Sequence, residues 1–507
     1  MCEEESDHGL FSFRALYEAY LACRKRKRNT ANALKFEADQ IENLRELSET
    51  LADGSYRPSR SVCFVTSVPK LREIFAADFR DRVVHHLLVP RLEKIYEPKF
   101  IYDSYACRVD KGTHAAVERL QSFMNKITRN GHRPAWFMQL DVRSFFMSID
   151  RELLYGIIKR QVADPVVLAL AKLIIDNDCT AGYVYKGDRG LLGRIPPHKS
   201  LFHVAAGKGL PIGNLTSQFF ANVYLNELDQ FVKHELKCRY YLRYVDDFIL
   251  LDESADELLQ LQEAIAAFLA ARLQLELKAG LILKRVSEGA DFLGYIVRPD
   301  YILVRNRVVG NLKANLRYFQ EKMVVKAAVG RDWYRAVHLH EDIVRDLRQT
   351  FASYLGHFSH ANAYNLIGGL WENNTWLGDV FALDRRDGLR LEPCYEPPEP
   401  PVCLKDQYLW AVKAFGGYCI FFQIGRFFEF FGRQAMMAGR VFGCAIGEDR
   451  RGLGKQCGFP VRMIKRFKER ARHRRWPYVV IAENGYYAKG LKRRVVTEKL
   501  TFCGGMA

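Results

Sequence analysis

Two adjacent aspartates, Asp246 and Asp247, lie in residues 240–251, a run that is otherwise almost wholly apolar and aromatic. Two β-prone segments flank the pair, which predicts a β-hairpin with the aspartates at or beside its tip. Neighbouring carboxylates repel each other, and a shared proton or a cation relieves that repulsion. Because aspartate is also a common turn residue, the pair alone is compatible with a plain turn. A divalent-metal site would need a third carboxylate from elsewhere in the chain.

A third carboxylate is available in the apolar run of residues 136–142, which carries the single aspartate Asp141. Mg²⁺ prefers hard oxygen ligands and keeps positions open for the phosphates of a substrate. A strand with one aspartate and a hairpin with two can hold a pair of such ions about 3.5–4 Å apart, which stabilises the attacking and leaving oxygens of a phosphoryl transfer. We therefore take Asp141, Asp246 and Asp247 as candidate catalytic residues and metal ligands.

The order of these segments resembles the palm of reverse transcriptases. The resemblance rests on Tyr244-Val-Asp-Asp247 with Asp141 upstream, and it extends from about residue 11 to about residue 376. It implies an RNA-directed DNA polymerase, a nucleotidyltransferase that uses deoxynucleoside triphosphates. It also adds Val142 to the ligands of two Mg²⁺ ions, for which Mn²⁺ could substitute.

A loop between the two palm segments narrows the resemblance. Residues 209–218 lie where the superfamily has its template and nucleotide loop, and most relatives carry Gln-Gly…Ser-Pro there. This chain carries Ile212-Gly213 and Ser217-Gln218 instead, the variant typical of reverse transcriptases of diversity-generating retroelements. The resemblance implies that Ile212, Gly213 and Gln218 contact nucleotide or template and that Ile212 and Gln218 set fidelity.

Three further side chains are expected at the incoming nucleotide. Arg72, with Lys70 as helper, lies in a segment that resembles the one whose basic residues hold a triphosphate, and a guanidinium fork suits phosphate oxygens. Phe146 takes the place of an aromatic that packs under the sugar and excludes a 2′-hydroxyl. The alternatives are an ordinary charged surface strand for the first segment and a core role for Phe146, the role that we assign to Phe145.

Two other segments have less definite roles. Residues 103–108 resemble a segment that contacts template or nucleotide. Relatives usually carry a lysine a few residues after the alternating run 273–277, where it is thought to protonate the leaving pyrophosphate. Our register places Leu281 at that position, so neither Lys278 nor Lys284 receives the role.

Composition sets limits on these expectations. The chain has 507 residues, enough for about three or four structural units, and its formal net charge of +17 favours a polyanionic partner or an acidic surface. The 12 cysteines include no Cys-x-x-Cys pair, which is typical of reduced thiols in a cytosolic protein. Residues 1–7 do not resemble a signal peptide, and no apolar run is long enough to span a membrane. We expect a cytoplasmic protein of a bacterium, archaeon or phage, with no membrane partner.

The expected fold class is α+β: a right-hand polymerase with fingers, palm and helical thumb, followed by a small α/β C-terminal domain. An N-terminal extension and fingers would cover residues 1–135, with a basic cluster at 24–28 that is either a solvated face or a phosphate contact. The remaining boundaries are a palm with inserted fingers segments at 136–300, a thumb at 301–388, a proline-rich linker at 389–404 and a basic module at 405–507.

The module resembles the N-terminal mismatch-reading domain of MutS proteins. There a Gly-Asp-Phe-Tyr-Glu turn enters the minor groove at a mispair, and here the turn reads Gly425-Arg-Phe-Phe-Glu429. The resemblance implies that Phe427 stacks into the duplex and Glu429 bonds to the displaced base, while Arg426, in place of aspartate, strengthens attraction to the backbone. An apolar wedge succeeds cheaply only at a weakened base step. The alternatives are plain core aromatics, or a basic clamp that grips structured RNA.

The leading hypothesis is a diversity-generating retroelement enzyme that copies a template-repeat RNA into cDNA with errors at template adenines, for transfer to target DNA. The linker would tether the module at high effective concentration without a fixed interface. The module could replace the small accessory protein that many relatives use. The alternatives are another bacterial reverse transcriptase, of the retron, abortive-infection or group II intron kind, and an inactive scaffold that binds nucleic acid. Three intact aspartates argue against the scaffold, because such a carboxylate cluster is costly near apolar strands.

Overall fold

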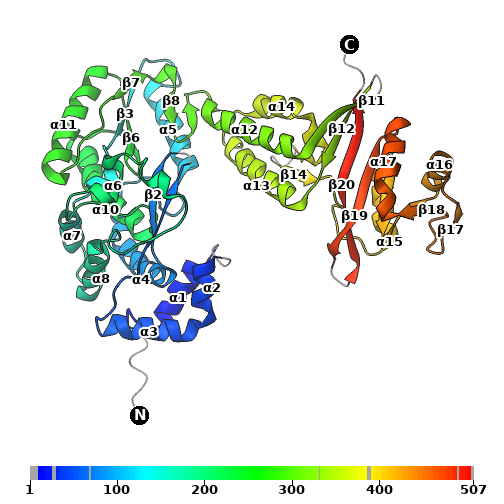
Figure 1. The fold of residues 1–507 in the computed structure, drawn as a ribbon. Coiled ribbons are helices and arrows are strands. Elements are labelled where there is room, and N and C mark those ends of the chain that lie inside the picture. Colours follow the sequence, from blue (N-terminus) through cyan, green and yellow to red (C-terminus); the bar gives the residue numbers. More distant parts are fainter. Residues whose placement is uncertain are drawn as a thin grey trace. The chain divides into compact units, whose positions relative to one another are not determined.

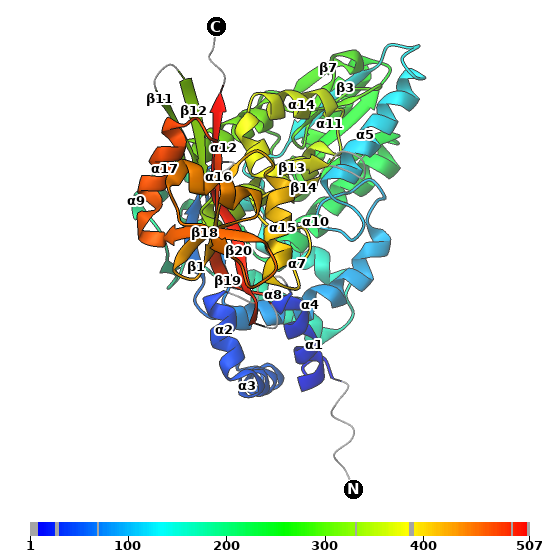
Figure 2. The same cartoon turned by 90° about the vertical axis from the view of Figure 1, so that its right-hand side faces the viewer.

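The computed structural model describes residues 9–25, 30–67, 70–329, 332–384, 390–487 and 490–503. Most of the predicted basic cluster at 24–28 lies outside these residues. The chain forms two compact units, which we describe separately: unit 1 is residues 1–293 with 297–300, and unit 2 is residues 294–296 with 301–507. Figure 1 shows the ribbon, and Figure 2 shows it turned by 90°. Among the described helices, none combines the length and apolar character that crossing a membrane requires.

The centre of unit 1 is a four-stranded antiparallel sheet with the order β5-β6-β3-β7. Its strands are β3 (Trp136–Asp141), β5 (Tyr240–Tyr244), β6 (Asp247–Asp252) and β7 (Ile282–Arg285). Strands β5 and β6 form the predicted hairpin, and β3 runs beside β6 so that Asp141 lies opposite Asp247. Helices α5 (Thr113–Thr128) and α11 (Ala255–Leu273) pack on this sheet, and all four inner residues of β6 are buried.

A smaller sheet and a set of helices complete unit 1. The sheet has the order β2-β1-β4, with β1 (Val62–Thr66), β2 (Arg72–Ala76) and β4 (Val184–Tyr185). The helices are α1 (Phe13–Arg24), α2 (Ala31–Ala38), α3 (Gln40–Ala52), α4 (Phe79–Tyr96), α6 (Phe145–Ser148), α7 (Arg151–Lys159), α8 (Pro165–Asp176), α9 (Arg189–Leu192) and α10 (Leu215–Gln230). Helix α10 is buried along most of its length, so the loop that precedes it is anchored to a rigid element.

Unit 2 is built on an eight-stranded sheet with the order β11-β12-β20-β19-β15-β16-β18-β17. The strands are β11 (Val324–Val329), β12 (Asp332–His338), β15 (Cys419–Ile424), β16 (Phe427–Phe431), β17 (Gly447–Glu448), β18 (Lys455–Pro460), β19 (Tyr478–Tyr486) and β20 (Lys492–Cys503). The helices are α12 (Asn306–Met323), α13 (Glu341–Phe358), α14 (Tyr364–Glu372), α15 (Leu404–Ala414), α16 (Arg433–Phe442) and α17 (Ile464–His473). The other described strands of unit 2 are β10 (Ile302–Val304), β13 (Phe381–Asp384) and β14 (Arg390–Pro393), while β8 (Ala290–Phe292) belongs to unit 1 and β9 (Tyr295–Val297) spans the boundary.

Each face of this sheet carries its own core, because side chains along a strand alternate between faces. Ile420 and Phe422 pack with the apolar residues of α12, α13, α14 and α15. Cys419 and Phe421 pack with those of α16 and α17. Figure 1 shows α12, α13 and α14 on one side of β12, β19 and β20, with α17 on the other. Unit 2 is therefore a three-layer arrangement of helices, sheet and helices.

The expected thumb, 301–388, and the expected module, 405–507, are thus parts of one body. Strand β12 of the thumb pairs with β20 of the module over six residues, from Trp333 opposite Cys503 to His338 opposite Glu498. The prediction of a tether without a fixed interface is wrong, since the two segments share a sheet and a core. The thumb is also not purely helical, because it contributes the hairpin β11–β12.

Candidate active site and candidate nucleic-acid interface

The two adjacent aspartates lie at the tip of the β5–β6 hairpin, as predicted. Tyr244 is opposite Asp247, which leaves Val245 and Asp246 as a two-residue loop. Val245 has a φ of +55°, a conformation that β-branched residues rarely adopt. Backbone strain of this kind costs about 1–3 kcal/mol and persists where the surroundings enforce it, often at functional sites.

The three aspartates act on one another electrostatically. Burial, and next the charges of Asp141 and Asp247, raise the pKa of Asp246 to about 7. Burial and the charge of Asp141 raise the pKa of Asp247 to about 6. Asp246 and Asp247 therefore resist ionisation, and a nearby cation would remove that resistance. The sequence prediction that they converge is confirmed by the pairing of β3 with β6.

A lysine that the sequence analysis left without a role also lies here. Lys278 Nζ is 3.0 Å from Asp141 Oδ2, and its backbone N–H donates to the Asp141 carbonyl oxygen at 2.8 Å. The hydrogen bond to Asp141 raises the pKa of Lys278. By contrast, Lys284 lies within β7, opposite Phe137. Counting along the chain missed Lys278 because its segment meets the end of β3 through only a single bridge, between Leu277 and Val142.

A divalent cation such as Mg²⁺ needs several oxygen ligands close together. Among the residues that the structure describes, no three His, Cys, Asp or Glu side chains gather closely enough to make a ready metal site, and Asp141 pairs with Lys278 instead. The carboxylates of Asp141, Asp246 and Asp247, at neighbouring ends of β3 and β6, are nevertheless the hard oxygen donors that Mg²⁺ takes. The residues fit a divalent cation that competes with Lys278 for Asp141. The backbone of the buried Val142 as a further ligand stays a prediction.

Two basic side chains approach the same carboxylates from the small sheet. Arg72, at the start of β2, and Lys70, just before it, are both exposed. The charges of both lower the pKa of Asp247, and the charge of Arg72 also lowers the pKa of Asp246. The structure therefore brings the predicted phosphate-binding pair to the aspartates.

Phe146 and Ile212 pack against the same apolar cluster. Both are partly buried against a small core that includes Phe75 and Met147, whereas Phe145 is fully within the palm core, as we expected. The Ile212 carbonyl oxygen accepts a hydrogen bond from the Phe75 backbone N–H at 2.9 Å. The side chain of Ile212 thus packs against apolar side chains.

Glycine is required beside Ile212, and Gln218 lies at the start of α10. Gly213 has a φ of +123°, and a Cβ there would lie 2.7 Å from Ile74 Cγ2. Gln218 is exposed, and its Oε1 is 3.6 Å from Cys107 Sγ. Cys107, in the 103–108 segment, has a φ of +53°. Sequence reasoning missed this thiol, because a lone cysteine forms no pattern.

The second candidate site is the β15–β16 hairpin of unit 2. Its two-residue loop is Gly425–Arg426, and Phe427 follows with 47% of its surface exposed, while Phe428 is buried. Glu429 is engaged inside the protein: its Oε2 accepts from Arg451 Nη2 at 2.7 Å and from Gln456 Nε2 at 2.9 Å. Phe427 and Arg426 are therefore presented at the tip, and Glu429 is held behind it.

Comparisons with known proteins agree with this division. Residues 66–297 match the family described as reverse transcriptase (RNA-dependent DNA polymerase). Residues 403–502 match MutS domain I. Both resemblances noted in the sequence are thereby confirmed at the level of the domain.

Two curated relatives are similar to about half of the chain. Protein YkfC of Escherichia coli is 25% identical over 318 residues, 55% of this chain and 78% of YkfC. Group II intron-encoded protein LtrA of Lactococcus lactis is 24% identical over 323 residues, 51% of this chain and 50% of LtrA. The chain thus spans about half the length of LtrA.

Among solved structures, a Candida tropicalis telomerase matches with a TM-score of 0.35 and 11% identity, over 52% of this chain and 60% of the other. That likeness is too low to support an argument. The family match and the site geometry support an RNA-directed DNA polymerase: residues 66–297 are similar to reverse transcriptase domains, and residues 403–502 are similar to MutS domain I.

Proposed function

We propose that this polymerase is the enzyme of a diversity-generating retroelement, which copies a template-repeat RNA into cDNA with frequent errors at template adenines. The observation that carries the proposal is the Ile212-Gly213 and Ser217-Gln218 loop, with Ile212 packed against carbon. An apolar side chain cannot offer the hydrogen bond of a glutamine. Loss of a polar contact worth about 1 kcal/mol weakens discrimination about fivefold.

In the proposed reaction, Asp141, Asp246 and Asp247 would hold two Mg²⁺ ions, or Mn²⁺ in their place, with the Val142 carbonyl oxygen. Bound Mg²⁺ would stabilise the charge on the attacking and leaving oxygens of the transferred phosphoryl group. Arg72 and Lys70 bind the triphosphate of the incoming nucleotide. Phe146 excludes the 2′-hydroxyl of a ribonucleotide. Lys278 keeps a positive charge beside Asp141 until a cation takes its place.

The second candidate function is a reverse transcriptase of the group II intron kind, which the similarity to LtrA favours. The two candidates share the catalytic aspartates and differ in the loop at 212–218. A retron or abortive-infection enzyme would differ in the same way. An error spectrum therefore separates them, whereas a simple activity assay does not.

For unit 2 we propose binding of duplex nucleic acid, with the β15–β16 tip as the contact. In support, Arg426 and Phe427 are exposed at the tip, in a chain of net charge +17. Glu429 already accepts hydrogen bonds from Arg451 and Gln456. A hydrogen bond from Glu429 to a displaced base should therefore be weak, and any preference for a mispair should be modest. The rival is a basic clamp that grips template RNA and replaces an accessory protein.

The test of the main proposal compares the parent chain with Ile212→Gln on an RNA template of even base composition, by sequencing the cDNA. We expect errors opposite adenine to fall several-fold in Ile212→Gln, and errors opposite other bases to change less. Ile212→Leu is the matched control, since it keeps an apolar side chain and should keep the adenine errors. Equal error rates opposite all four bases in the parent chain would reject the retroelement assignment and leave the group II intron kind.

A further inference from the structure

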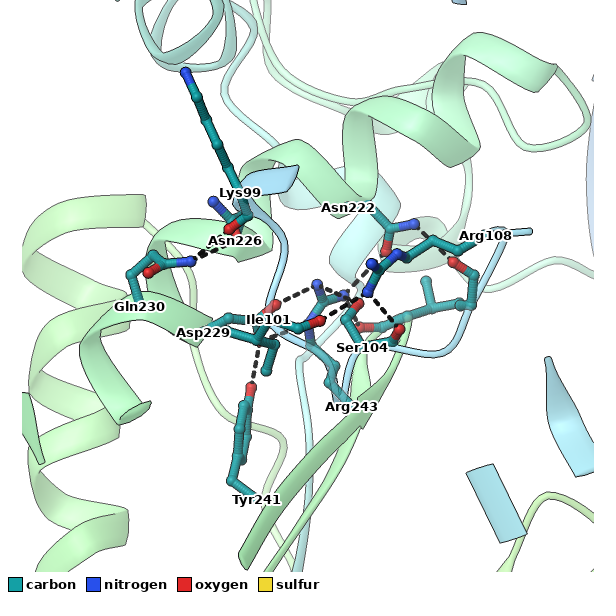
Figure 3. Close-up of polar contacts among 12 residues, drawn as sticks. Lys99, Ile101, Ser104, Arg108, Asn222, Asn226, Asp229, Gln230, Tyr241 and Arg243 are labelled. Carbon is teal, nitrogen blue, oxygen red and sulfur yellow. Dashed lines mark hydrogen bonds and ion pairs between the residues drawn. The ribbon is translucent and has the colours of Figure 1, made fainter. Parts of the chain in front are cut away.

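The strained turn that carries the catalytic aspartates is held by one buried side chain. The carbonyl oxygen of Val245 accepts a hydrogen bond from Arg243 Nη1 at 3.0 Å. Arg243 lies near the end of β5 and is completely buried. Figure 3 shows its guanidinium between α10 and the chain segment around Ser104. Arg243 thus supports the loop through a hydrogen bond to the Val245 carbonyl oxygen.

The guanidinium is itself fixed from every side. Nε and Nη2 hold the carboxylate of Asp229 at 2.8 and 2.6 Å. Nη1 reaches Asn222 Oδ1 at 3.2 Å, and Nη2 reaches Ser104 Oγ at 3.1 Å. With the bond to Val245, all five N–H groups of the guanidinium have an acceptor. Its position is therefore fully determined.

Asp229 is equally constrained. It is completely buried on α10, and Tyr241 donates its hydroxyl to Asp229 Oδ1 at 2.7 Å (Figure 3). A buried ion pair of this kind adds little net stability, but a missing partner leaves a charge stranded in apolar surroundings. Such pairs are better explained by the geometry that they enforce.

The backbone of β5 is fastened at the same place. Arg243 N–H donates to the Asp103 carbonyl oxygen and Tyr105 N–H donates to the Arg243 carbonyl oxygen, both at 2.9 Å. Asn222 Nδ2 also donates to the Ala106 carbonyl oxygen at 2.8 Å. The network therefore ties the turn to α10 and to the segment that ends at Cys107, the neighbour of Gln218.

We propose that Arg243 is a positioning residue of the polymerase: fixed by Asp229, it holds the Val245 carbonyl and keeps the strained turn in the conformation that presents Asp246 and Asp247 to Asp141. The inference rests on the proposed catalytic role of these aspartates. Lysine cannot replace Arg243, because a single ammonium group has three donors and no planar fork. Glycine at 245, by contrast, adopts a positive φ without support.

The test is a double-mutant cycle of Arg243→Lys and Val245→Gly in the full chain, with kcat, the KM for dNTP and the Tm measured for each protein. In the Val245 background, Arg243→Lys should lower kcat about 10- to 100-fold, as expected from release of the strained turn. The KM for dNTP should change less than about threefold, since Arg243 does not touch the nucleotide. In the Val245→Gly background the same change should cost less than about threefold in kcat, while its effect on Tm remains.

Tyr96→Phe is the matched control for buried hydrogen bonds, because Tyr96 donates to the Ile157 carbonyl oxygen at 3.2 Å, away from the turn. It should lower Tm without a change in kcat. If Arg243→Lys shows no cooperative unfolding, Asp229→Asn takes its place in the cycle, since it keeps the shape and loses the charged fork.

An equal loss of kcat in both backgrounds, or no loss in either, would overturn the positioning role. Asp246→Asn is measured alongside to separate this inference from the proposed function. If Asp246→Asn keeps its activity, the catalytic assignment fails. If Asp246→Asn is inactive and the two changes of the cycle are additive, only the role of Arg243 fails.

Discussion

Two β-hairpins, one in each unit, have loops of the same length and differ in the residue that bends them. The polymerase hairpin turns through Val245–Asp246 and the C-terminal hairpin through Gly425–Arg426. The first loop residue has nearly the same φ in both, +55° and +58°. Glycine adopts this conformation freely, whereas valine does so only under constraint.

Each loop is supported by a largely buried arginine–carboxylate pair, but a different member of the pair contacts the loop. In the polymerase hairpin, the arginine of the completely buried pair Arg243–Asp229 holds a loop carbonyl. In the C-terminal hairpin, the carboxylate of the less buried pair Arg494–Glu483 accepts the Gly425 N–H at 2.9 Å. The first loop is pre-organised for a fixed geometry, as phosphoryl transfer requires. The second loop is also held, since Gln423 Nε2 donates to the Gly425 carbonyl oxygen at 3.0 Å and the Val461 N–H donates to the Arg426 carbonyl oxygen at 2.9 Å, but its glycine adopts the turn without strain.

The largest expected effect is loss of catalysis when the first loop loses a carboxylate. Asp246→Asn, and likewise Asp141→Asn, should reduce primer extension with Mg²⁺ at least about 1,000-fold, or about 4 kcal/mol, because a negative ligand of the ions is gone. Near-normal extension by Asp246→Asn would remove the catalytic assignment from this hairpin.

The stability of Asp246→Asn provides its folding control. The folded-state pKa of Asp246, about 7, lies above the ordinary value, so the parent chain loses stability as pH rises towards and through 7. Asparagine has no such loss. Without divalent ions, the Tm of Asp246→Asn relative to the parent should therefore rise between pH 5 and pH 8. A variant that is inactive and also less stable at pH 8 would indicate misfolding.

The next effect concerns the aromatic beside the first hairpin. Phe146→Ala should admit ribonucleotides, raising the GTP-to-dGTP incorporation ratio by about 10-fold or more, because the wall under the sugar is removed. Phe145→Leu is a control for core packing, since Phe145 is buried beside it. An unchanged ratio in Phe146→Ala would return Phe146 to a core role.

Gly425→Val places valine at the matching position of the second hairpin. No atom lies within 4 Å of the added Cβ, so the cost is backbone strain alone, about 1–3 kcal/mol of folding free energy. Thermal unfolding should show a Tm lower by several degrees. An unchanged Tm would mean that the hydrogen bond from residue 425 to Glu483 holds a valine in this conformation as well as the hydrogen bond from Arg243 holds Val245.

The smallest effect is expected at the tip of the second hairpin. Phe427→Ala in the full chain should abolish a few-fold preference for mispaired over matched DNA and leave general affinity within about twofold, since phosphate contacts carry it. Titrations at two salt concentrations against matched DNA, mispaired DNA and hairpin RNA measure this. Tightest binding to RNA with no effect of Phe427→Ala would favour the clamp.

Local patterns predicted the β5–β6 hairpin with its aspartates, because alternation and turn chemistry act over a few residues, whereas the turn at 425–429 was inferred from the resemblance to MutS proteins. They did not predict that β12 joins β20, since the paired residues lie 160 to 170 positions apart in the sequence and the pairing depends on which surfaces remain uncovered. The supposed linker was assigned from its prolines alone, and composition does not reveal a shared core.

The side chains that support the site were missed for a related reason. Arg243 and Asp229 carry charges, which a sequence pattern assigns to solvent, and only the folded chain shows them as a buried pair. Lys278 was missed because residues 274–281 form no regular strand and meet β3 only through the Leu277–Val142 bridge, so counting from relatives gave Leu281. The residue types at the hairpin tip indicated the chemistry of the site, whereas the buried Arg243–Asp229 pair that supports the tip had no such signal.

The most direct test of the account is extension of a primer on a defined RNA of even base composition by the purified parent chain, with dNTPs and Mg²⁺, followed by sequencing of the cDNA. The account predicts full-length cDNA that depends on Asp246 and whose errors concentrate opposite template adenines. Absence of cDNA, or cDNA that forms equally well with Asp246→Asn, would contradict it.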